Sequence, residues 1–428
     1  MTGDIAPPLP ERLPVFDSAE PLRHLPFFTE LASLDDNDPG WRSVSAGLVL
    51  LRLVDSWFDE GAAVAAPDSW GVRSVRAAIE EMPSGSPSRA LLLGALEAMT
   101  HATMSDMRAV EPKLMAYARC LDLDGKWALA ADVYETVIVH VHPDDESEIS
   151  VNALLRRGHC LRQLGQDAEA TESFSTAGDV AHRHGDMIGA LRARIGEAKI
   201  IVARGNLPAA DQLLRETVEQ ADAHGLREVR SLASHDRSYI AYATGNYDAA
   251  VRFAYDALRD NVSSSERDRI LNDLATSFYM LGVRSAARDA FLILAATARE
   301  QYQRWIASIN LMELAADDLM ELEFERHRRQ LSAATLPPLL RTQFELHAGQ
   351  GYRQLGNDEA AVQWMERALE TATTHSLNQH VFAAEKAIRT VTGPRRAVRT
   401  EEPVADIPRD VELIAHELRE MRRLTMVT

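Results

Sequence analysis

Residues 158–177 read GHCLRQLGQDAEATESFSTA, and their spacing indicates two helices joined by a tight turn. Small and bulky apolar side chains follow one another at steps of 3, 4, 5, 4 and 3 residues, at Gly158, Leu161, Gly165, Ala170, Phe174 and Ala177. Steps of 3 and 4 place side chains on one face of a helix. Glycine permits the backbone conformation that a tight turn requires. We therefore predict a helical hairpin in which Leu161 and Phe174 fill the space between the helices.

Glycine recurs in this register along the chain. Six glycines lie at intervals of 40, 40, 40, 37 and 74 residues, at Gly125, Gly165, Gly205, Gly245, Gly282 and Gly356. Such a period, with apolar helical stretches on both sides of each glycine, is typical of a repeat array, because one hairpin cannot bury its apolar face alone. The sequence therefore predicts an all-α fold, an α-solenoid of stacked antiparallel helical hairpins.

The order of small residue, bulky apolar residue, turn glycine, alanine, aromatic residue and alanine resembles the tetratricopeptide repeat (TPR), in a long-period form of about 37–40 residues. The other units that share this order contain Ala118, Leu121, Gly125, Trp127, Ala130 and Tyr134; Ala198, Ile201, Gly205, Leu207, Ala210 and Leu214; Gly245, Tyr247, Ala250, Ala254 and Ala257; Ala275, Phe278, Gly282, Ala287 and Phe291; and Gly349, Tyr352, Gly356, Ala361, Met365 and Ala368. The resemblance implies a right-handed superhelix of about seven hairpins over residues 106–392. One hairpin, over about 305–331, has Leu319 in place of the turn glycine, and we expect it to be distorted.

The segments outside the array have their own patterns. Residues 1–40 begin with a proline-rich stretch, which predicts an extended leader. Residues 41–105 predict three helices with breaks near Ala66 and over 83–87, and they are expected to cap the array. Residues 393–428 read as a charged linker and an amphipathic helix with apolar residues at Val411, Ile414, Leu418 and Met421. Three roles are open for that helix: it caps the array, it occupies the groove of the array, or it mediates association with another copy or a partner.

Composition narrows the function classes. The chain has 428 residues, is 46% hydrophobic and 26% charged, and has a formal charge of -18. This balance predicts a folded protein and argues against broad binding to nucleic acid or to an anionic membrane. We find no secretory signal and no apolar run long enough to span a bilayer, so we expect a cytoplasmic protein. Four lysines against 42 arginines suggest a bacterial source. Cys120 and Cys160 are expected to be free thiols.

We find no sequence motif for catalysis, and we expect no enzyme activity and no cofactor. The most metal-like group contains two His-x-His pairs and nearby acids, at His140, His142, Asp144, Asp145, Glu146, His182 and His184. Residues two apart on a helix point in nearly opposite directions, so neither pair suits one ion. Instead, His142, His184 and His224 are expected at helix C-terminal ends, where their charge complements the helix dipole. A metal site is therefore not predicted.

In TPR proteins the second, fifth, ninth, twelfth and thirteenth positions of each first helix tend to face the concave side. Carried onto six units, these 30 positions hold six basic residues, the last of them Arg353, and one acid, Asp122. The chain average would give about three basic and about four or five acidic residues. The expected groove residues are the basic, amide, histidine and tyrosine side chains Arg119, Asn152, His159, Arg162, Arg192, Lys199, His235, Tyr239, Tyr242, Arg269, Asn272 and Tyr279.

Such a groove predicts binding of an acidic or extended peptide, because arginine pairs well with carboxylates. Single-stranded nucleic acid uses similar features. The alternative is that these arginines pair with glutamates of adjacent helices and the tyrosines pack. We therefore predict a noncatalytic interaction scaffold whose partner is an acidic peptide or protein. The rival hypothesis is a regulatory sensor that resembles TPR peptide receptors and changes curvature on binding its ligand. The pattern of TPR domains that clamp chaperone C-termini is not matched, since Leu155 and His159 occupy key positions.

Overall fold

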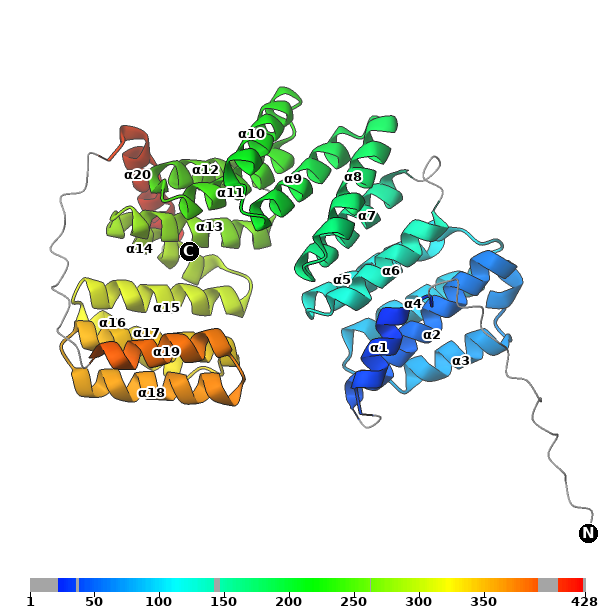
Figure 1. Cartoon of the computed structure of the whole chain (residues 1–428), viewed down its shortest axis with the longest axis horizontal. Coiled ribbons are helices and arrows are strands. Elements are labelled where there is room, and N and C mark those ends of the chain that lie inside the picture. The colour runs from blue at the N-terminus through cyan, green and yellow to red at the C-terminus, as the bar shows by residue number, and fades with distance from the viewer. Residues whose placement is uncertain (1–21, 36–37, 142–146, 262, 392–406, 426–428) are drawn as a thin grey trace, which may run out of the picture. The chain divides into compact units, whose positions relative to one another are not determined.

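The computed structural model describes residues 22–35, 38–141, 147–261, 263–391 and 407–425 (Figure 1). Within these residues all regular secondary structure is helical, which confirms the predicted all-α class. The helices form antiparallel hairpins that stack on their neighbours in an α-solenoid. Among the same residues, no helix combines the length and the apolar character needed to cross a membrane. The proline-rich stretch over 1–21 and most of the expected linker, 393–406, lie outside the described residues.

The chain divides into two compact units, Met1–Gly196 and Glu197–Thr428. The helices of the first unit are α1 (Leu25–Ser33), α2 (Pro39–Glu60), the short 3-10 helix η1 (Ala62–Ala65), α3 (Trp70–Glu80), α4 (Pro87–His101), α5 (Met107–Leu123), α6 (Trp127–His140), α7 (Ser147–Gln163) and α8 (Asp167–Arg183). The division falls within α9 (Met187–Ala203). The helices α2, α3 and α4 are those expected between Trp41 and Thr103.

The second unit continues the hairpin pattern. Its helices are α10 (Leu207–Ala223), α11 (Arg227–Ala243), α12 (Tyr247–Asp260), α13 (Ser264–Met280), α14 (Arg284–Thr297), α15 (Gln301–Asp317), α16 (Glu321–Ser332), α17 (Pro338–Gln354), α18 (Asp358–Thr374), α19 (Asn378–Val391) and α20 (Arg409–Thr425). Each pair α11–α12, α13–α14 and α17–α18 packs as one hairpin. The first helices of the hairpins, such as α11 and α13, also contact each other.

The predicted turn glycines have left-handed backbone conformations. At Gly165, where φ is 73°, the amide of Gly165 donates to the carbonyl of Arg162 at 3.0 Å. The amide of Gln166 donates to the carbonyl of Leu161 at 2.9 Å. These two bonds satisfy carbonyls that the end of α7 would otherwise leave unpaired. Positive φ values recur at the other five predicted turn glycines.

Glycines also end the second helices of two hairpins. Gly185 has a φ of 72° and Gly225 a φ of 68°, and His184 and His224 are the C-cap residues of α8 and α10. This confirms the predicted position of these two histidines at helix C-terminal ends. His142 lies outside the described residues.

Leu319 makes the turn of the hairpin α15–α16 without a glycine. Its φ is 56°, and the amide of Met320 donates to the carbonyl of Ala315 at 2.7 Å, in the same pattern as at Gly165. The turn is therefore preserved, although a leucine in this conformation is strained. The second helix of this hairpin is short: α16 has 12 residues, whereas α12 and α14 have 14 and α8 and α10 have 17.

Two glycines make room for the ring of Phe174 in the first unit. A Cβ atom on Gly158 would lie 2.8 Å from Cε1 of Phe174, and one on Gly196 would lie 2.4 Å from Cδ1. The ring is 4% exposed, and Leu161 is 7% exposed. The predicted interior of this hairpin is thus confirmed, and α9 contributes Gly196 to it.

Helix α1 lies within residues 1–40, which the sequence analysis assigned to an extended leader. Pro26 stands at the start of the helix, where proline is tolerated because the first amides have no helical partner. Phe27 is 0% exposed and anchors the helix. Next to it, His24 lies between two carboxylates, with Nδ1 2.7 Å from Asp132 and Nε2 3.2 Å from Asp55. These contacts join α1 to α2 and α6.

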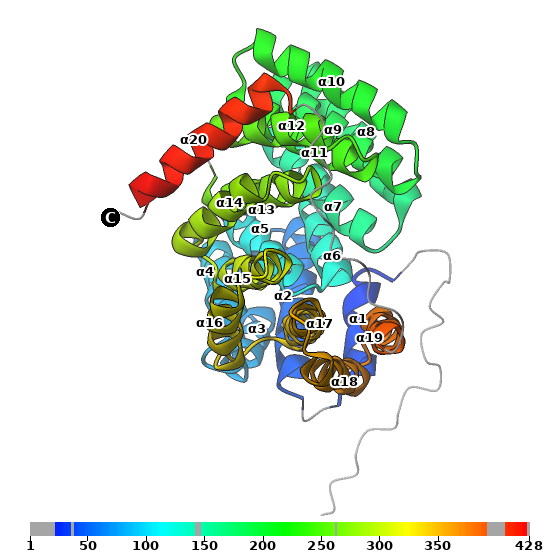
Figure 2. The same cartoon turned by 90° about the vertical axis from the view of Figure 1, so that its left-hand side faces the viewer.

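Helix α20 returns to the middle of the second unit and packs on α12 and α14 (Figure 2). Val411, Ile414 and Leu418 are buried there, in the same apolar core as the interior of α13–α14. Both contacted helices are second helices of their hairpins. The amphipathic helix therefore neither covers the last hairpin nor lies along the first helices, and its buried apolar face contacts its own chain.

Candidate functional site

The twelve predicted groove residues lie on first helices, and the two compact units divide them. In the first unit, α5, α7 and α9 carry Arg119, Asn152, His159, Arg162 and Arg192. In the second unit, α9, α11 and α13 carry Lys199, His235, Tyr239, Tyr242, Arg269, Asn272 and Tyr279. The two sets therefore lie in separate units, and each has its own chemistry.

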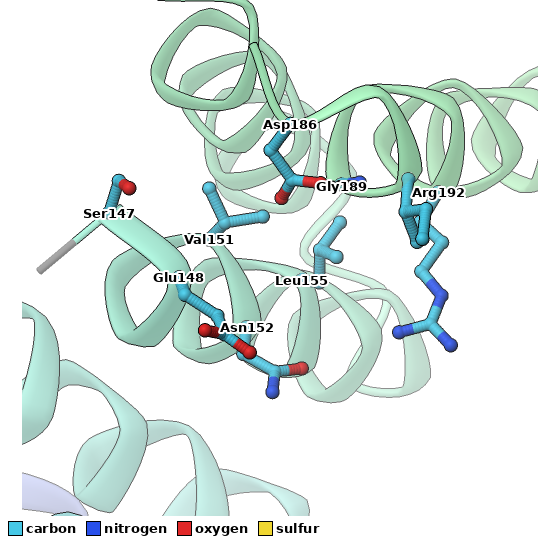
Figure 3. A pocket seen from close by; sticks show the side chains of 9 residues that line it. Ser147, Glu148, Val151, Asn152, Leu155, Asp186, Gly189 and Arg192 are labelled. Carbon is cyan, nitrogen blue, oxygen red and sulfur yellow. Dashed lines mark hydrogen bonds between the residues drawn. The ribbon is translucent and has the colours of Figure 1, made fainter. Parts of the chain in front are cut away.

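A pocket of about 310 Å³ opens between α7 and α9 in the first unit (Figure 3). Two predicted residues, Asn152 and Arg192, line it. Val151 and Leu155 lie on the side of α7 that faces α9, so the pocket combines an apolar floor with polar groups at its edge. The other lining residues are Ser147, Glu148, Asp186, Ile188 and Gly189. This mixture of apolar and convergent polar groups suits ligand binding.

Gly189 keeps the pocket wall close to the start of α9. Its amide donates to Oδ1 of Asp186 at 2.9 Å, which satisfies one of the free amides of the helix N-terminus. A Cβ atom at this position would lie 2.2 Å from Oδ2 of Asp186 and 2.7 Å from Cγ1 of Val151. Any larger residue would therefore displace the capping carboxylate or the apolar floor.

Guanidinium groups gather on the same face of the first unit. Arg156 of α7 is half-buried, and its pKa is lowered by burial and by the positive charges of Arg119 and Arg192. Asp122 is the carboxylate among them. Burial acts to raise the pKa of Asp122, but His159, Arg119 and Arg156 together lower it below its usual range. Two guanidinium groups, Arg119 and Arg156, thus act on the one carboxylate of Asp122.

The remaining predicted residues of the first unit lie beside this group. Nε2 of His159 is 3.5 Å from Oδ1 of Asp122, and Asn152 is exposed. Among the described residues, Arg119 and Arg162 form no ion pair within 4.0 Å. Arg156 was missed in the sequence analysis because it lies four residues after Asn152, at a repeat position that the concave-face count did not include. The adjacent Arg156-Arg157 pair was the available signal.

The basic residues of the second unit are paired with carboxylates of the same region. His235 is 2.8 Å from Asp273 and 3.7 Å from Glu266, and Arg269 is 2.8 Å from the same Glu266. Burial acts to lower the pKa of His235, but its bonds to Asp273 and Glu266 raise it to about 9. His235 thus pairs with acids of the next first helix, α13, whereas Arg269 pairs with a glutamate of its own helix and not of an adjacent one.

Lys199 shows the same pairing, with Nζ 3.3 Å from Oδ2 of Asp236. Asn272 donates from Nδ2 to Asp273 at 3.2 Å, while its Oδ1 is buried and accepts no hydrogen bond from the described residues. None of these carboxylates occupies one of the counted concave positions. The count of six bases and one acid therefore overstates the positive charge of this face.

The tyrosines of the second unit differ in their surroundings. Tyr239 is 56% exposed. Tyr242 packs edge-on against Tyr247, with ring centroids 5.6 Å apart. Tyr279 donates its hydroxyl to Asp317, and burial and this bond raise the pKa of the phenol. Tyr239 thus offers an open ring, whereas Tyr279 is held by its neighbour.

A second pocket, of about 300 Å³, lies in the second unit between α10, α11 and α12. Its lining includes Arg237, which contacts the ring of Phe253 at 4.1 Å and donates to Asp211 at 2.8 Å. None of the predicted groove residues lines it. The two charged groups at its wall, Asp211 and Arg237, are thus already paired with each other.

The histidines considered as metal ligands contact protein groups. His140 is 2.8 Å from Asp55 and stacks on Phe58, and His182 bonds the carbonyl of Gly178 at 2.7 Å. Among the described residues no group of three or more His, Cys, Asp or Glu side chains is arranged to hold a metal ion. The neighbouring acids Asp144, Asp145 and Glu146 lie outside those residues. Cys120 and Cys160 are free, and burial raises the pKa of Cys160 to about 12.

The fold and the turn register define an α-solenoid of TPR-like helical hairpins. Residues 346–375, which cover the second half of α17 and all of α18, match the family model of the tetratricopeptide repeat. The chain thus contains TPR-like repeats. No curated protein matches it in sequence.

Several solved structures resemble the chain at low identity. The Rap conjugation gene regulator of the plasmid pLS20, solved in complex with the Phr* peptide, is 15% identical with a TM-score of 0.44, over 82% of this chain and 99% of that one. The apo quorum sensor NprR from B. thuringiensis is 11% identical with a TM-score of 0.46, over 75% and 97%. A tetratricopeptide repeat protein from Parabacteroides merdae is 13% identical with a TM-score of 0.42, over 66% and 98%. These similarities are too weak to indicate what this chain binds.

Proposed function

We propose that this protein is a noncatalytic interaction module that binds an extended peptide segment on the first-helix face of its first unit. The observation that carries the proposal is the pocket between α7 and α9, lined by Asn152 and Arg192 beside an apolar floor. A binding face along stacked first helices is what a hairpin array offers a partner.

The pocket chemistry suits a peptide. The amide of Asn152 can donate to and accept from a peptide backbone, and the Arg192 guanidinium can hold a carboxylate in a two-pronged hydrogen bond. Val151, Leu155 and Ile188 provide apolar surface for a side chain. Arg119 and Arg156, which share the carboxylate of Asp122, favour a partner that carries negative charge.

The second unit favours a related role as a regulatory sensor. Helix α20 is held on α12 and α14 partly by side chains that remain near the surface, such as Arg252 with Asp410 at 3.0 Å. A ligand that shifts these helices would change the affinity of this helix for its site. The sensor hypothesis therefore predicts ligand-dependent exposure of α20, whereas a plain scaffold leaves it unchanged.

The test begins with selection of displayed random peptides on the full-length protein. Binding of the selected peptides is then measured by fluorescence anisotropy for the wild type, for Asn152→Ala/Arg192→Glu and for Arg73→Glu/Arg76→Glu. The control arginines are exposed on α3 of the same unit. We expect the pocket variant to lose binding and the control to keep it. If no peptide is selected, or both variants bind alike, the proposed function is wrong.

Hydrogen exchange of α20 with and without the selected peptide separates the two roles. Faster exchange over 409–425 on binding supports the sensor. Unchanged exchange, with peptide bound, supports the scaffold.

A further inference from the structure

Helix α20 is held by one face on α12 and α14 of the second unit (Figure 2). Val411, Ile414 and Leu418 follow one another at steps of 3 and 4 residues and are buried there. Leu413, on another side of the helix, is 58% exposed. A helix that buries one apolar stripe and leaves its other sides in solvent has the contact pattern of an amphipathic helix bound in a groove.

Charged side chains at both ends of α20 fix its direction on α12 and α14. Near the start of α20, Arg252 of α12 donates to Asp410 at 3.0 Å. Near its end, Asp289 of α14 accepts a hydrogen bond from Arg422 at 2.7 Å. A helix bound in the opposite direction would bring an arginine toward Arg252 and an acid toward Asp289, so like charges would repel. The surface therefore selects the direction of a helix as well as its apolar pattern.

Asp289 gives this surface a feature that core packing does not require. Its carboxylate is buried, and both of its ion-pair partners, Arg422 and Arg419 at 3.8 Å, belong to α20. Replacing a buried ion pair by apolar side chains is often neutral or stabilising, so stability alone does not call for a charge here. Charged groups in a contact surface instead distinguish one partner sequence from another.

We call the surface of α12 and α14 that α20 covers the docking surface, and its polar members are Arg252, Tyr255 and Asp289. Tyr255 donates its hydroxyl to Glu417. All three polar members contact α20 through side chains, so a helix of another chain with the same side chains forms the same contacts. Residues 392–408 join α19 to α20 and tether α20 to the surface. A tether of this kind gives an effective concentration on the order of millimolar.

We propose that the docking surface binds an amphipathic helix of another protein, and that α20 occupies the surface until that helix displaces it. The partner helix carries apolar residues at the positions of Val411, Ile414 and Leu418, an acid near its start and an arginine near its end. Charge complementarity carries this assignment, since Arg252 and Asp289 select opposite charges at opposite ends of the helix. The inference does not rest on the pocket of the first unit, because the docking surface and α20 both lie in the second unit.

The experiment measures binding of a fluorescent peptide to the full-length protein by fluorescence anisotropy. The peptide has the sequence of residues 409–425 with blocked ends, and it represents the partner helix. In Leu418→Asp, α20 loses its buried apolar contact and leaves the docking surface open. We expect this variant to bind the peptide about 100-fold more tightly than the wild type, which is the ratio of a millimolar effective concentration to a dissociation constant of about 10 μM.

Two further variants grade the competition by α20. Arg422→Ala keeps the apolar face of α20 and removes its bond to Asp289, so its affinity for the peptide should lie between those of the wild type and Leu418→Asp. Arg423→Ala is the matched control, because Arg423 pairs with Glu420 within α20 at 2.6 Å. This control should bind the peptide as weakly as the wild type.

Exchange of one charge pair tests recognition. When Arg252→Glu is added to Leu418→Asp, the wild-type peptide should bind about tenfold more weakly, because an acid then faces Asp410. A peptide with Asp410→Arg should restore the affinity. Both side chains are partly exposed, so the exchange preserves the fold.

Three results would overturn the proposal. The first is that Leu418→Asp binds the peptide no more tightly than the wild type; if this variant does not fold, Arg422→Ala decides in the same way. The second is that the charge exchange leaves the affinity unchanged, which means that the surface does not select its helix. The third is a wild-type dimer in sedimentation velocity that Leu418→Asp abolishes, because the occupant is then α20 of a second copy and not another protein.

Discussion

Arg422 of α20 donates a hydrogen bond to Asp289 of α14 at 2.7 Å. The carboxylate is 4% exposed, and burial raises its pKa although the charges of Arg422 and Arg419 act in the opposite direction. A buried carboxylate of this kind needs its partner, because an unpaired charge in the interior is costly. Asp289 is thus the polar anchor at which α20 meets the second helices.

Removal of this anchor should loosen α20 without unfolding the hairpins. For Arg422→Ala we expect local opening of α20 to become easier by about 1–3 kcal/mol, since the carboxylate of Asp289 is left without its closest donor. Hydrogen exchange over 409–425 measures the effect. The matched control is Arg423→Ala, because Arg423 pairs with Glu420 within α20 at 2.6 Å and is 64% exposed. Equal exchange in the two variants would contradict the anchor role.

Replacing Leu319 by glycine should stabilise the protein. Its φ of 56° is unfavourable for leucine, and it is 51% exposed, so Leu319→Gly relieves strain and loses little buried surface. Glycine also adds conformational entropy to the unfolded chain, which offsets part of this relief. We therefore expect the free energy of unfolding of Leu319→Gly to rise by about 0.5–1 kcal/mol. The control is Leu322→Gly, because Leu322 is 89% exposed within α16. Its free energy of unfolding should fall by about 1 kcal/mol, since glycine is a poor helix former. Urea unfolding distinguishes the signs, and a loss in Leu319→Gly would refute the strain argument.

Gly196→Ala should destabilise the first unit, although alanine is a better helix former than glycine. The new methyl group would meet the ring of Phe174 at 2.4 Å, and an overpacked interior costs about 1–3 kcal/mol. Phe174→Leu alone leaves a void and is also destabilising. Combined, the two changes should cost less than their sum, as a double-mutant cycle on thermal stability would show. Additive losses would mean that the ring and the glycine are not coupled.

The position of α1 should depend on pH. Burial acts to lower the pKa of His24, but its bonds to Asp132 and Asp55 raise it from 6.5 to about 9. Since the folded pKa is above the unfolded one, the stabilising contribution is complete below about pH 6.5 and is lost as the pH rises through about 9. The contribution of His24 to the free energy of unfolding is on the order of 3 kcal/mol.

Asp55 limits the same contact at low pH. Burial acts to raise its pKa, but the bonds with His140 and His24 lower it well below its usual range. Its contribution is therefore present above about pH 4 and is lost as the pH falls further. The protection of the α1 amides, relative to their intrinsic exchange at each pH, should be greatest between about pH 4 and 6.5. His24→Gln should remove the increase in exchange beyond intrinsic chemistry between pH 6.5 and 9, and a variant that retains it would disprove the role of His24.

The hairpins could be predicted from the sequence because their causes are local. A glycine such as Gly165 fixes the turn, and the spacing of Leu161 and Phe174 fixes which sides of the two helices meet. Helix α1 could not be predicted in this way. Six prolines among the first 26 residues indicated an extended chain, whereas Phe27 and His24 form their contacts with residues far along the sequence.

The candidate site was only partly accessible from sequence. Asn152 and Arg192 follow from the helix register, and they line the pocket. The neighbouring residues Arg156 and Asp186 do not follow from the helix register, because they lie at positions that the concave-face pattern omits. The pairing of His235 with Asp273 was hidden for the same reason. The site of α20 was also inaccessible, since apolar residues at helical spacing indicate that a helix packs but not against which surface.

The return of α20 also changes how the second unit should fold. In an array of hairpins, each repeat meets only its neighbours, so stability builds from local terms and folding can begin at several places. The bonds from Arg422 to Asp289 and from Tyr255 to Glu417 join residues 133 and 162 positions apart. Closing so long a loop costs chain entropy before the contact forms, which raises the contact order of the unit and slows this step. The second unit should therefore lose its final helix in a separate, early unfolding phase and regain it last.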